Sequence, residues 1–163
     1  MVNIEEFKKT GFQLVKGLFD KSEVDIIRIE AQEIFKRQMR QIGINVNDID
    51  SEETFNKKLF QLFNERPDLI VSSGKHIQHL ISLHKLSLDN RITDLLKELG
   101  FGFPNICTRP VMFFNAKKMA KKQVYWKTDP HQDWRSMQGS LNSMVVWVAL
   151  CDIDISLGAL EVI

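Results

Sequence analysis

The chain has 163 residues, of which 44% are hydrophobic and 26% are charged, which suits one globular domain and excludes a disordered chain or a fibre. Its 22 basic and 21 acidic residues give a formal net charge of +1, so the charge gives no reason to expect nucleic acid or an anionic membrane as a partner. Neither a signal-peptide run nor a bilayer-spanning segment is present in the sequence, and we expect a cytoplasmic protein.

The first hundred residues carry mostly helical patterns. A short strand is predicted at residues 11–15, before a turn near Gly17. Apolar residues then recur at helical spacing and predict helices at residues 22–40, 51–64, 73–84 and 89–99. The first helix is the clearest, because Asp20 is a candidate cap and Glu23 follows in the first turn. The loop at residues 43–50 is polar enough to be exposed.

After Gly100 the pattern becomes that of β-structure. β-Branched and aromatic residues predict strands at residues 106–114, 124–126, 143–150 and 159–163. The last of these strands is apolar and has no cap, which would leave unpaired edges and an uncovered face. We therefore expect the chain to be an N-terminal portion of a longer protein.

The segment from Asp129 to Trp134 has the most specific pattern for a functional site. It contains His131 and Asp133, and side chains two residues apart in an extended backbone point to the same face. A mononuclear Fe(II) oxygenase holds its metal with two histidines and one carboxylate, leaving other positions open. His131 and Asp133 are therefore candidate catalytic residues and metal ligands, two of the three that such a site needs.

Other residues suggest different sites. His76, His79 and His84 suggest a zinc site, since histidines three residues apart share a helix face, but no acidic or cysteine partner follows at fitting spacing. Arg109 and the lysines at positions 117, 118, 121 and 122 could attract an anionic substrate, although a solvated loop is the simpler interpretation.

The motif and its surroundings carry a family resemblance. The run from His131 to Leu150, followed by Asp152 and by Gly-Ala-Leu-Glu-Val-Ile at residues 158–163, resembles the phytanoyl-CoA dioxygenase family of Fe(II)/2-oxoglutarate oxygenases. The opening at residues 7–19 and its following helix are similar to the start of that family. The resemblance thus covers both ends of the chain, with a less distinctive helical middle.

The resemblance implies a fold and a site. The fold would be α+β and mainly β, a cupin-like jelly roll or double-stranded β-helix, buttressed by N-terminal helices and truncated after its first core strands. Residues 1–100 would form the buttress and residues 101–163 the first part of the jelly roll, within a single domain. His131 and Asp133 would bind Fe(II), and Trp147 and Asn142 would line the pocket for 2-oxoglutarate. A second histidine ligand and an arginine that anchors 2-oxoglutarate are expected beyond Ile163.

The resemblance also implies a reaction. The enzyme would hydroxylate an unactivated C–H bond of a small molecule, consuming O₂ and converting 2-oxoglutarate to succinate and CO₂, and the 163-residue chain would be inactive alone. Two alternatives remain open: a non-catalytic binding module that keeps part of the fold, and a metal protein that uses the upstream histidines. The sequence names neither the substrate nor the oligomeric state.

Overall fold

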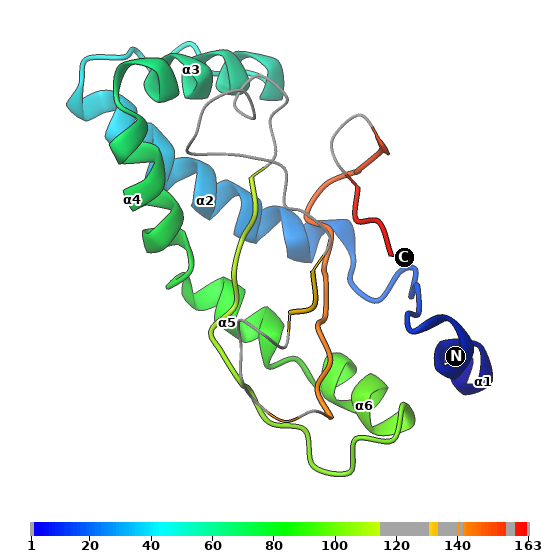
Figure 1. Cartoon of the computed structure of the whole chain (residues 1–163). Coiled ribbons are helices and arrows are strands. Elements are labelled where there is room, and N and C mark those ends of the chain that lie inside the picture. The colour runs from blue at the N-terminus through cyan, green and yellow to red at the C-terminus, as the bar shows by residue number, and fades with distance from the viewer. Residues whose placement is uncertain (1, 115–130, 134–139, 141, 156–158, 163) are drawn as a thin grey trace.

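The computed structural model describes residues 2–114, 131–133, 140, 142–155 and 159–162. In this part of the chain, the regular elements are α1 (Ile4–Thr10), α2 (Lys21–Gln41), α3 (Glu52–Glu65), α4 (Pro67–Ile77), α5 (Ile81–Ser87) and α6 (Asn90–Glu98). The long helix α2 runs through the middle of the molecule, with α3 and α4 at one end and α5 and α6 towards the other (Figure 1). None of the described helices is long and apolar enough to cross a membrane.

Local signals in the sequence explain where the main helices begin. Ser51 caps α3 by accepting a hydrogen bond from the Thr54 N–H, and Asp89 caps α6 by accepting one from the Arg91 N–H. Helix α2 begins after Asp20, whose backbone N–H donates to the Glu23 carboxylate at 2.8 Å. These bonds satisfy backbone N–H groups that a helix start would otherwise leave without partners.

A hydrophobic core joins α2, α3 and α4. Helix α2 packs against α3, α4 and α5, and α3 packs against α4. The cluster is built from buried side chains of these helices and the loop after α2: Ala31, Phe35, Met39, Ile44, Phe55, Leu59, Leu62, Phe63, Ile70 and Ile77. Met112 and Phe114, from the segment after α6, pack against the same cluster. The later part of the chain is therefore held on the helices by side-chain contacts.

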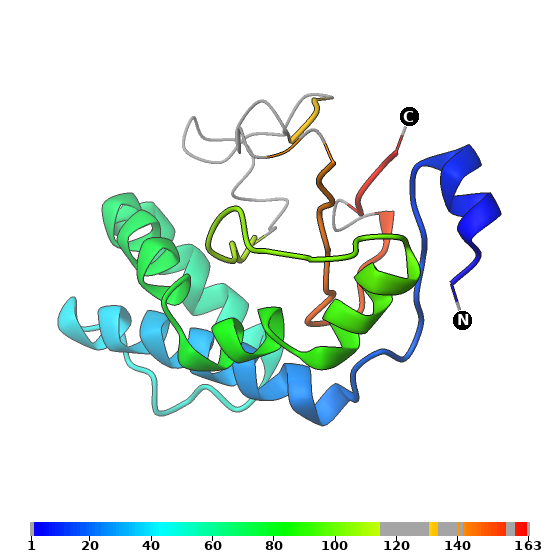
Figure 2. The same cartoon turned by 90° about the horizontal axis from the view of Figure 1, so that it is seen from below.

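The described non-helical segments after α6 lie over one face of the helices. Figure 2, turned by 90°, shows the described residues from 101 onward on one side of the layer formed by α2, α4, α5 and α6. Residues 106–114 and 143–150 run past the helices in Figure 1 without joining into a sheet. Whether residues 1–100 and 101–163 form a single domain stays a prediction.

The prediction of a mainly β jelly roll is wrong for the described residues, which are helical or irregular and contain no strand. The predicted strands at residues 11–15, 106–114 and 143–150 form no ladder, and the described part of 159–163 forms none. β-Branched and aromatic residues favour a half-buried pleated surface, but a strand also needs a hydrogen-bonded neighbour. Within the described residues, the contacts that hold residues 106–114 and 143–150 are made by side chains such as Phe114, Phe113 and Arg109. The predicted strand at 124–126 lies outside the described residues.

The helical predictions succeeded for three of four segments. Helices α2, α3 and α6 confirm those at 22–40, 51–64 and 89–99. The helix predicted at 73–84 is instead α4 and α5, broken at residues 78–80. Ile77 and Leu83 are both buried, yet six residues at 100° each would place them about 120° apart on one straight helix. The break allows both side chains to reach the interior.

Two further details of the N-terminal half differ from the sequence prediction. Helix α1 was not predicted; Asn3 caps it by accepting from the Glu6 N–H, and Gly11 ends it at a φ of 76°. The loop at residues 43–50 is only partly exposed, because Ile44 is buried in the core. The turn predicted near Gly17 is present.

Candidate functional site

His131 and Asp133 face each other across 3.1 Å, measured from the imidazole Nε2 to the carboxylate Oδ1. Their side chains are 48% and 36% exposed, so both can meet a solute as well as each other. The predicted convergence of the two side chains is therefore confirmed, and their role as metal ligands stays a prediction. Because a carboxylate only accepts hydrogen bonds, the imidazole donates through Nε2 in this contact.

The two side chains fit part of an iron site. An imidazole nitrogen and a carboxylate oxygen are two of the three donors of the facial arrangement that binds Fe(II), and here they already point at one location. No group of three or more His, Cys, Asp or Glu side chains comes together among the described residues. A third ligand would thus have to come from outside the described part.

The residues predicted to line the co-substrate pocket lie near the end of the chain. Trp147 is 51% exposed and stacks on Phe113, with ring centroids 5.0 Å apart and an interplanar angle of 24°. Asn142 is exposed, and its backbone N–H donates to the Ser140 Oγ at 3.1 Å. No hydrogen bond within the described residues joins Trp147 or Asn142 to the His131–Asp133 pair. Their roles remain predictions.

Phe113 is a residue of this region that the sequence reasoning missed. It lies in a segment whose side chains alternate in direction: Met112 and Phe114 pack against the helical core, while Phe113 is 62% exposed and meets Trp147. The ring of Phe114 meets Phe35 of α2 edge to face, at 5.0 Å and 89°. The alternation could have been read from the sequence, but the partner of Phe113 could not.

Arg109 is held at the other end of that segment. Its Nε donates to the Gln78 Oε1 at 2.7 Å, and the Gln78 carbonyl oxygen lies 3.0 Å from the His84 Nε2. Gln78 thus ties the break between α4 and α5 to the segment at 106–114. The lysines at 117–122, together with Asp129 and Trp134, lie outside the described residues.

The upstream histidines do not form the zinc site considered from the sequence. His76 lies at the end of α4, His79 lies in the following turn, and the His84 ring bonds the Gln78 carbonyl group. The break in the helix removes the shared helix face on which that interpretation depended.

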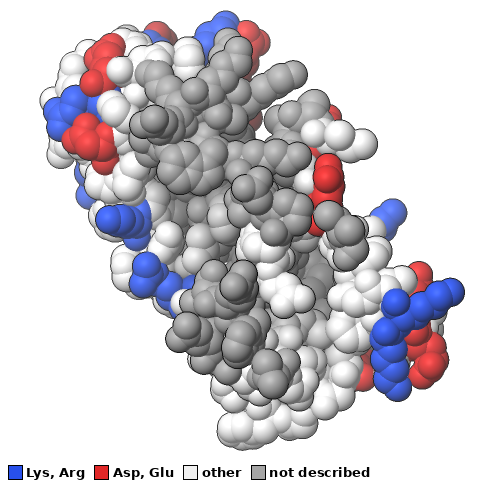
Figure 3. Space-filling model, viewed as in Figure 1, with Lys and Arg blue, Asp and Glu red and all other residues white. Residues whose placement is uncertain are grey.

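The side of the molecule drawn in Figure 3 shows basic and acidic side chains close together at the α3 end and at the α1 end, and basic ones without acidic neighbours beside α4.

Among the described residues, the two carboxylates with the most lowered pKa values lie in the helical part of the molecule. Hydrogen bonds from the Arg91 guanidinium lower the pKa of Glu23 and the pKa of Asp89 to about 2 each. Arg91 bridges the two, with its Nη2 2.6 Å from the Glu23 Oε1 and its Nε 2.8 Å from the Asp89 Oδ1. These groups join the start of α6 to the start of α2, which gives them a structural role.

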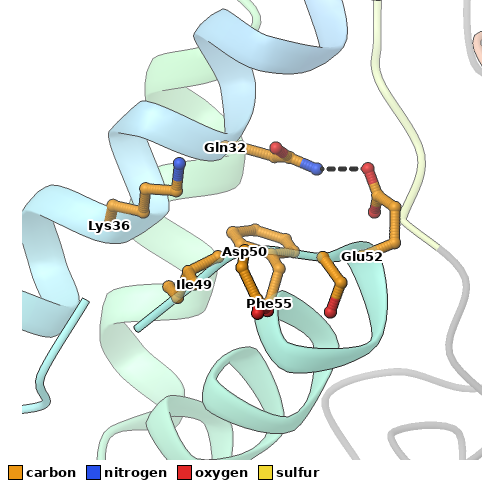
Figure 4. A pocket seen from close by; sticks show the side chains of 7 residues that line it. Gln32, Lys36, Ile49, Asp50, Glu52 and Phe55 are labelled. Carbon is orange, nitrogen blue, oxygen red and sulfur yellow. Dashed lines mark hydrogen bonds between the residues drawn. The ribbon is translucent and has the colours of Figure 1, made fainter. Parts of the chain in front are cut away.

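A pocket of about 220 Å³ lies between α2 and the start of α3 (Figure 4), lined by Gln32, Lys36, Ile49, Asp50, Ser51, Glu52 and Phe55. Its volume is below the range of about 300 to 1,000 Å³ that is usual for ligand sites. Its polar groups also have partners in the protein: the Gln32 amide donates to the Glu52 carboxylate at 2.9 Å, and Lys36 pairs with Glu33. Arg28 pairs with Glu52 as well. The pocket is a small polar gap between α2 and the start of α3.

Comparison with known proteins identifies one family. The family model described as phytanoyl-CoA dioxygenase (PhyH) matches residues 7–163, which is nearly the whole chain. No curated protein and no solved structure matches the chain. The match includes His131, Asp133, Asn142 and Trp147.

Proposed function

The chain belongs to the phytanoyl-CoA dioxygenase family, whose members are generally iron- and 2-oxoglutarate-dependent oxygenases, and we propose that it serves such a reaction. His131 and Asp133 are the proposed Fe(II) ligands, and the substrate is a small molecule with an unactivated C–H bond that becomes hydroxylated. The observation that carries the proposal is the 3.1 Å contact between the His131 Nε2 and the Asp133 Oδ1 in a chain of this family.

The chemistry of the two side chains supports this role. A neutral imidazole and one carboxylate neutralise only one of the two charges of Fe(II), so an anionic 2-oxo acid can still bind beside them. Bound iron would couple the conversion of 2-oxoglutarate and O₂ into succinate and CO₂ to hydroxylation of the substrate. His131 must release the proton from its Nε2 before that atom can act as a ligand, and the exposed carboxylate of Asp133 is positioned to hold the metal from the same side.

The remaining assignments belong to the same proposal. Trp147 and Asn142 contribute to the 2-oxoglutarate pocket, because the family resemblance places co-substrate residues there. Action in the cytoplasm on a small-molecule substrate belongs to the proposal as well.

We predict that His131→Ala and Asp133→Ala each weaken Fe(II) binding by tenfold or more, since loss of even an outer partner of a metal ligand costs about 10- to 100-fold in affinity. Binding is measured by anaerobic titration of the purified protein, and turnover by succinate formation from 2-oxoglutarate. Both side chains are partly exposed, so the free energy of unfolding should change little.

His79→Ala and Asp94→Ala serve as matched controls, because both side chains are exposed and lie in the helical part of the molecule. They should leave iron affinity unchanged. Succinate formation at the wild-type rate in either His131→Ala or Asp133→Ala would contradict the proposal. Iron binding without any succinate, in a wild-type protein that carries the expected second histidine and arginine, would favour the non-catalytic binding module.

A further inference from the structure

We propose that Phe113 is a positioning residue that fixes the indole ring of Trp147 as a wall of the 2-oxoglutarate pocket. The inference rests on the proposed function, because it takes the pocket role of Trp147 from there. It adds a residue from a different segment and a physical reason for the orientation of the indole ring.

The stack leaves one face of Trp147 available to a ligand. The two rings lie 5.0 Å apart at 24°, so Phe113 covers one face of the indole, yet the Trp147 side chain is still 51% exposed. Phe113 is the ring partner that the structure gives Trp147 within the described residues. A nearly parallel stack holds the plane of the indole ring, and the open face can pack against the methylene groups of 2-oxoglutarate.

Phe113 itself is held by the helical core. Both of its neighbours pack on the buried cluster, and Phe114 meets Phe35 of α2 edge to face. Four residues earlier, Arg109 is bonded to Gln78 at 2.7 Å. The backbone of Phe113 is therefore fixed on both sides to the helices.

Among the described residues, the segment of Trp147 gives it no comparable support. In the described structure, residues 143–150 form no strand, and their backbone groups make no hydrogen bond to other backbone groups. The ring contact of Trp147 in the described structure is made by a residue of another segment, and this contact orients the indole ring. Removing the Phe113 ring should allow the indole ring to rotate. Binding of 2-oxoglutarate would then also have to order the indole ring, which lowers the affinity.

The test is a double-mutant cycle between Phe113 and Trp147. Phe113→Leu keeps apolar volume without a ring, and it should raise the KM for 2-oxoglutarate about two- to tenfold, which is the range expected from the worth of an aromatic pair. The value of kcat should change less than KM. Phe113→Tyr, which keeps the ring, should restore the wild-type KM.

The second arm of the cycle uses Trp147→Ala. In that background Phe113→Leu should have no further effect on KM, because the ring that Phe113 positions is gone. Val111→Ala is the matched control, since Val111 is 47% exposed and two residues away; it should leave KM unchanged. Thermal unfolding of every variant separates loss of fold from loss of co-substrate binding.

The outcomes distinguish this inference from the proposed function. An equal effect of Phe113→Leu with and without Trp147, or an unchanged KM in Phe113→Leu beside a raised KM in Trp147→Ala, overturns the positioning role alone. A wild-type protein that carries the expected second histidine and arginine but neither binds nor consumes 2-oxoglutarate overturns the proposed function and this inference with it.

Discussion

At the scale of single residues, Ser73 is the most unusual group of the core. Its side chain is 1% exposed in the middle of α4, and its Oγ has no hydrogen-bond partner in the described structure. A buried polar atom without a partner costs about 1 to 3 kcal/mol, and alanine is also the better helix former. Ser73 therefore lowers the stability of the helix packing that it belongs to.

We predict that Ser73→Ala raises the free energy of unfolding by about 1 kcal/mol, because it removes the unsatisfied hydroxyl group with little change in volume. Urea unfolding followed by circular dichroism measures the change. Ser72→Ala is the control: Ser72 is exposed and its Oγ donates to the Leu69 carbonyl oxygen at 3.1 Å, so the substitution gains helix propensity but removes no unsatisfied buried group. A destabilised Ser73→Ala would show that the hydroxyl group has a partner, such as a buried water molecule.

The same scale shows what the sequence can predict of the candidate site. His131 and Asp133 are two residues apart, close enough in sequence for local geometry to predict that their side chains meet, and the structure shows them in contact. Phe113 and Trp147 are 34 positions apart, and nothing local predicts that their rings stack. Contacts within a motif could thus be predicted, whereas contacts between segments required the fold.

At the scale of elements, Arg91 connects the beginnings of α2 and α6. Its guanidinium group bonds Glu23, Asp89 and the Leu18 carbonyl oxygen, and it lies 4.4 Å from the centre of the Phe19 ring. Helix periodicity predicted both helices because it depends on each segment alone. It could not predict this connection, which joins residues 68 positions apart.

We predict that Arg91→Met lowers the stability of the protein at pH 7 and that the difference from the wild type disappears in acid. Arg91 lowers the pKa of Glu23 from 4.5, and that of Asp89 from 3.8, to about 2. Carboxylates with a lowered pKa in the folded state stabilise it above their unfolded pKa, and this stabilisation is lost as the pH falls through the folded pKa. The loss should therefore occur between about pH 5 and pH 2.

Urea unfolding at a series of pH values tests this prediction. Arg37→Met is the matched control, since Arg37 is an exposed arginine of α2 for which the described structure shows no ion pair. Its effect should be small and independent of pH. A stability difference for Arg91→Met that stays constant from pH 7 to pH 2 would show that the ion pairs do not stabilise the fold.

At the scale of the whole molecule, the described chain has two parts: the helices, and the segments after α6, whose contacts with the helices are made by side chains. The helices satisfy their backbone groups internally and bury a shared core. The described segments after α6 depend on side chains such as Phe114, Phe113 and Arg109. The sequence pattern predicted this change of character near Gly100 correctly, but it assigned a sheet to the later part because alternation and β-propensity do not reveal whether a pairing strand is present.

Hydrogen exchange tests this division, and we predict three levels of protection. Amides of residues 31–39 in α2 should exchange slowest, because they are hydrogen-bonded and next to the core. Amides of residues 4–10 in α1 should exchange faster, since α1 is hydrogen-bonded but has no buried residue. Amides of residues 143–150 should exchange fastest, because they lack backbone partners in the described structure. Protection at 143–150 equal to that of α2 would mean that this segment is paired in a sheet, and the correction of the jelly-roll prediction would then be wrong.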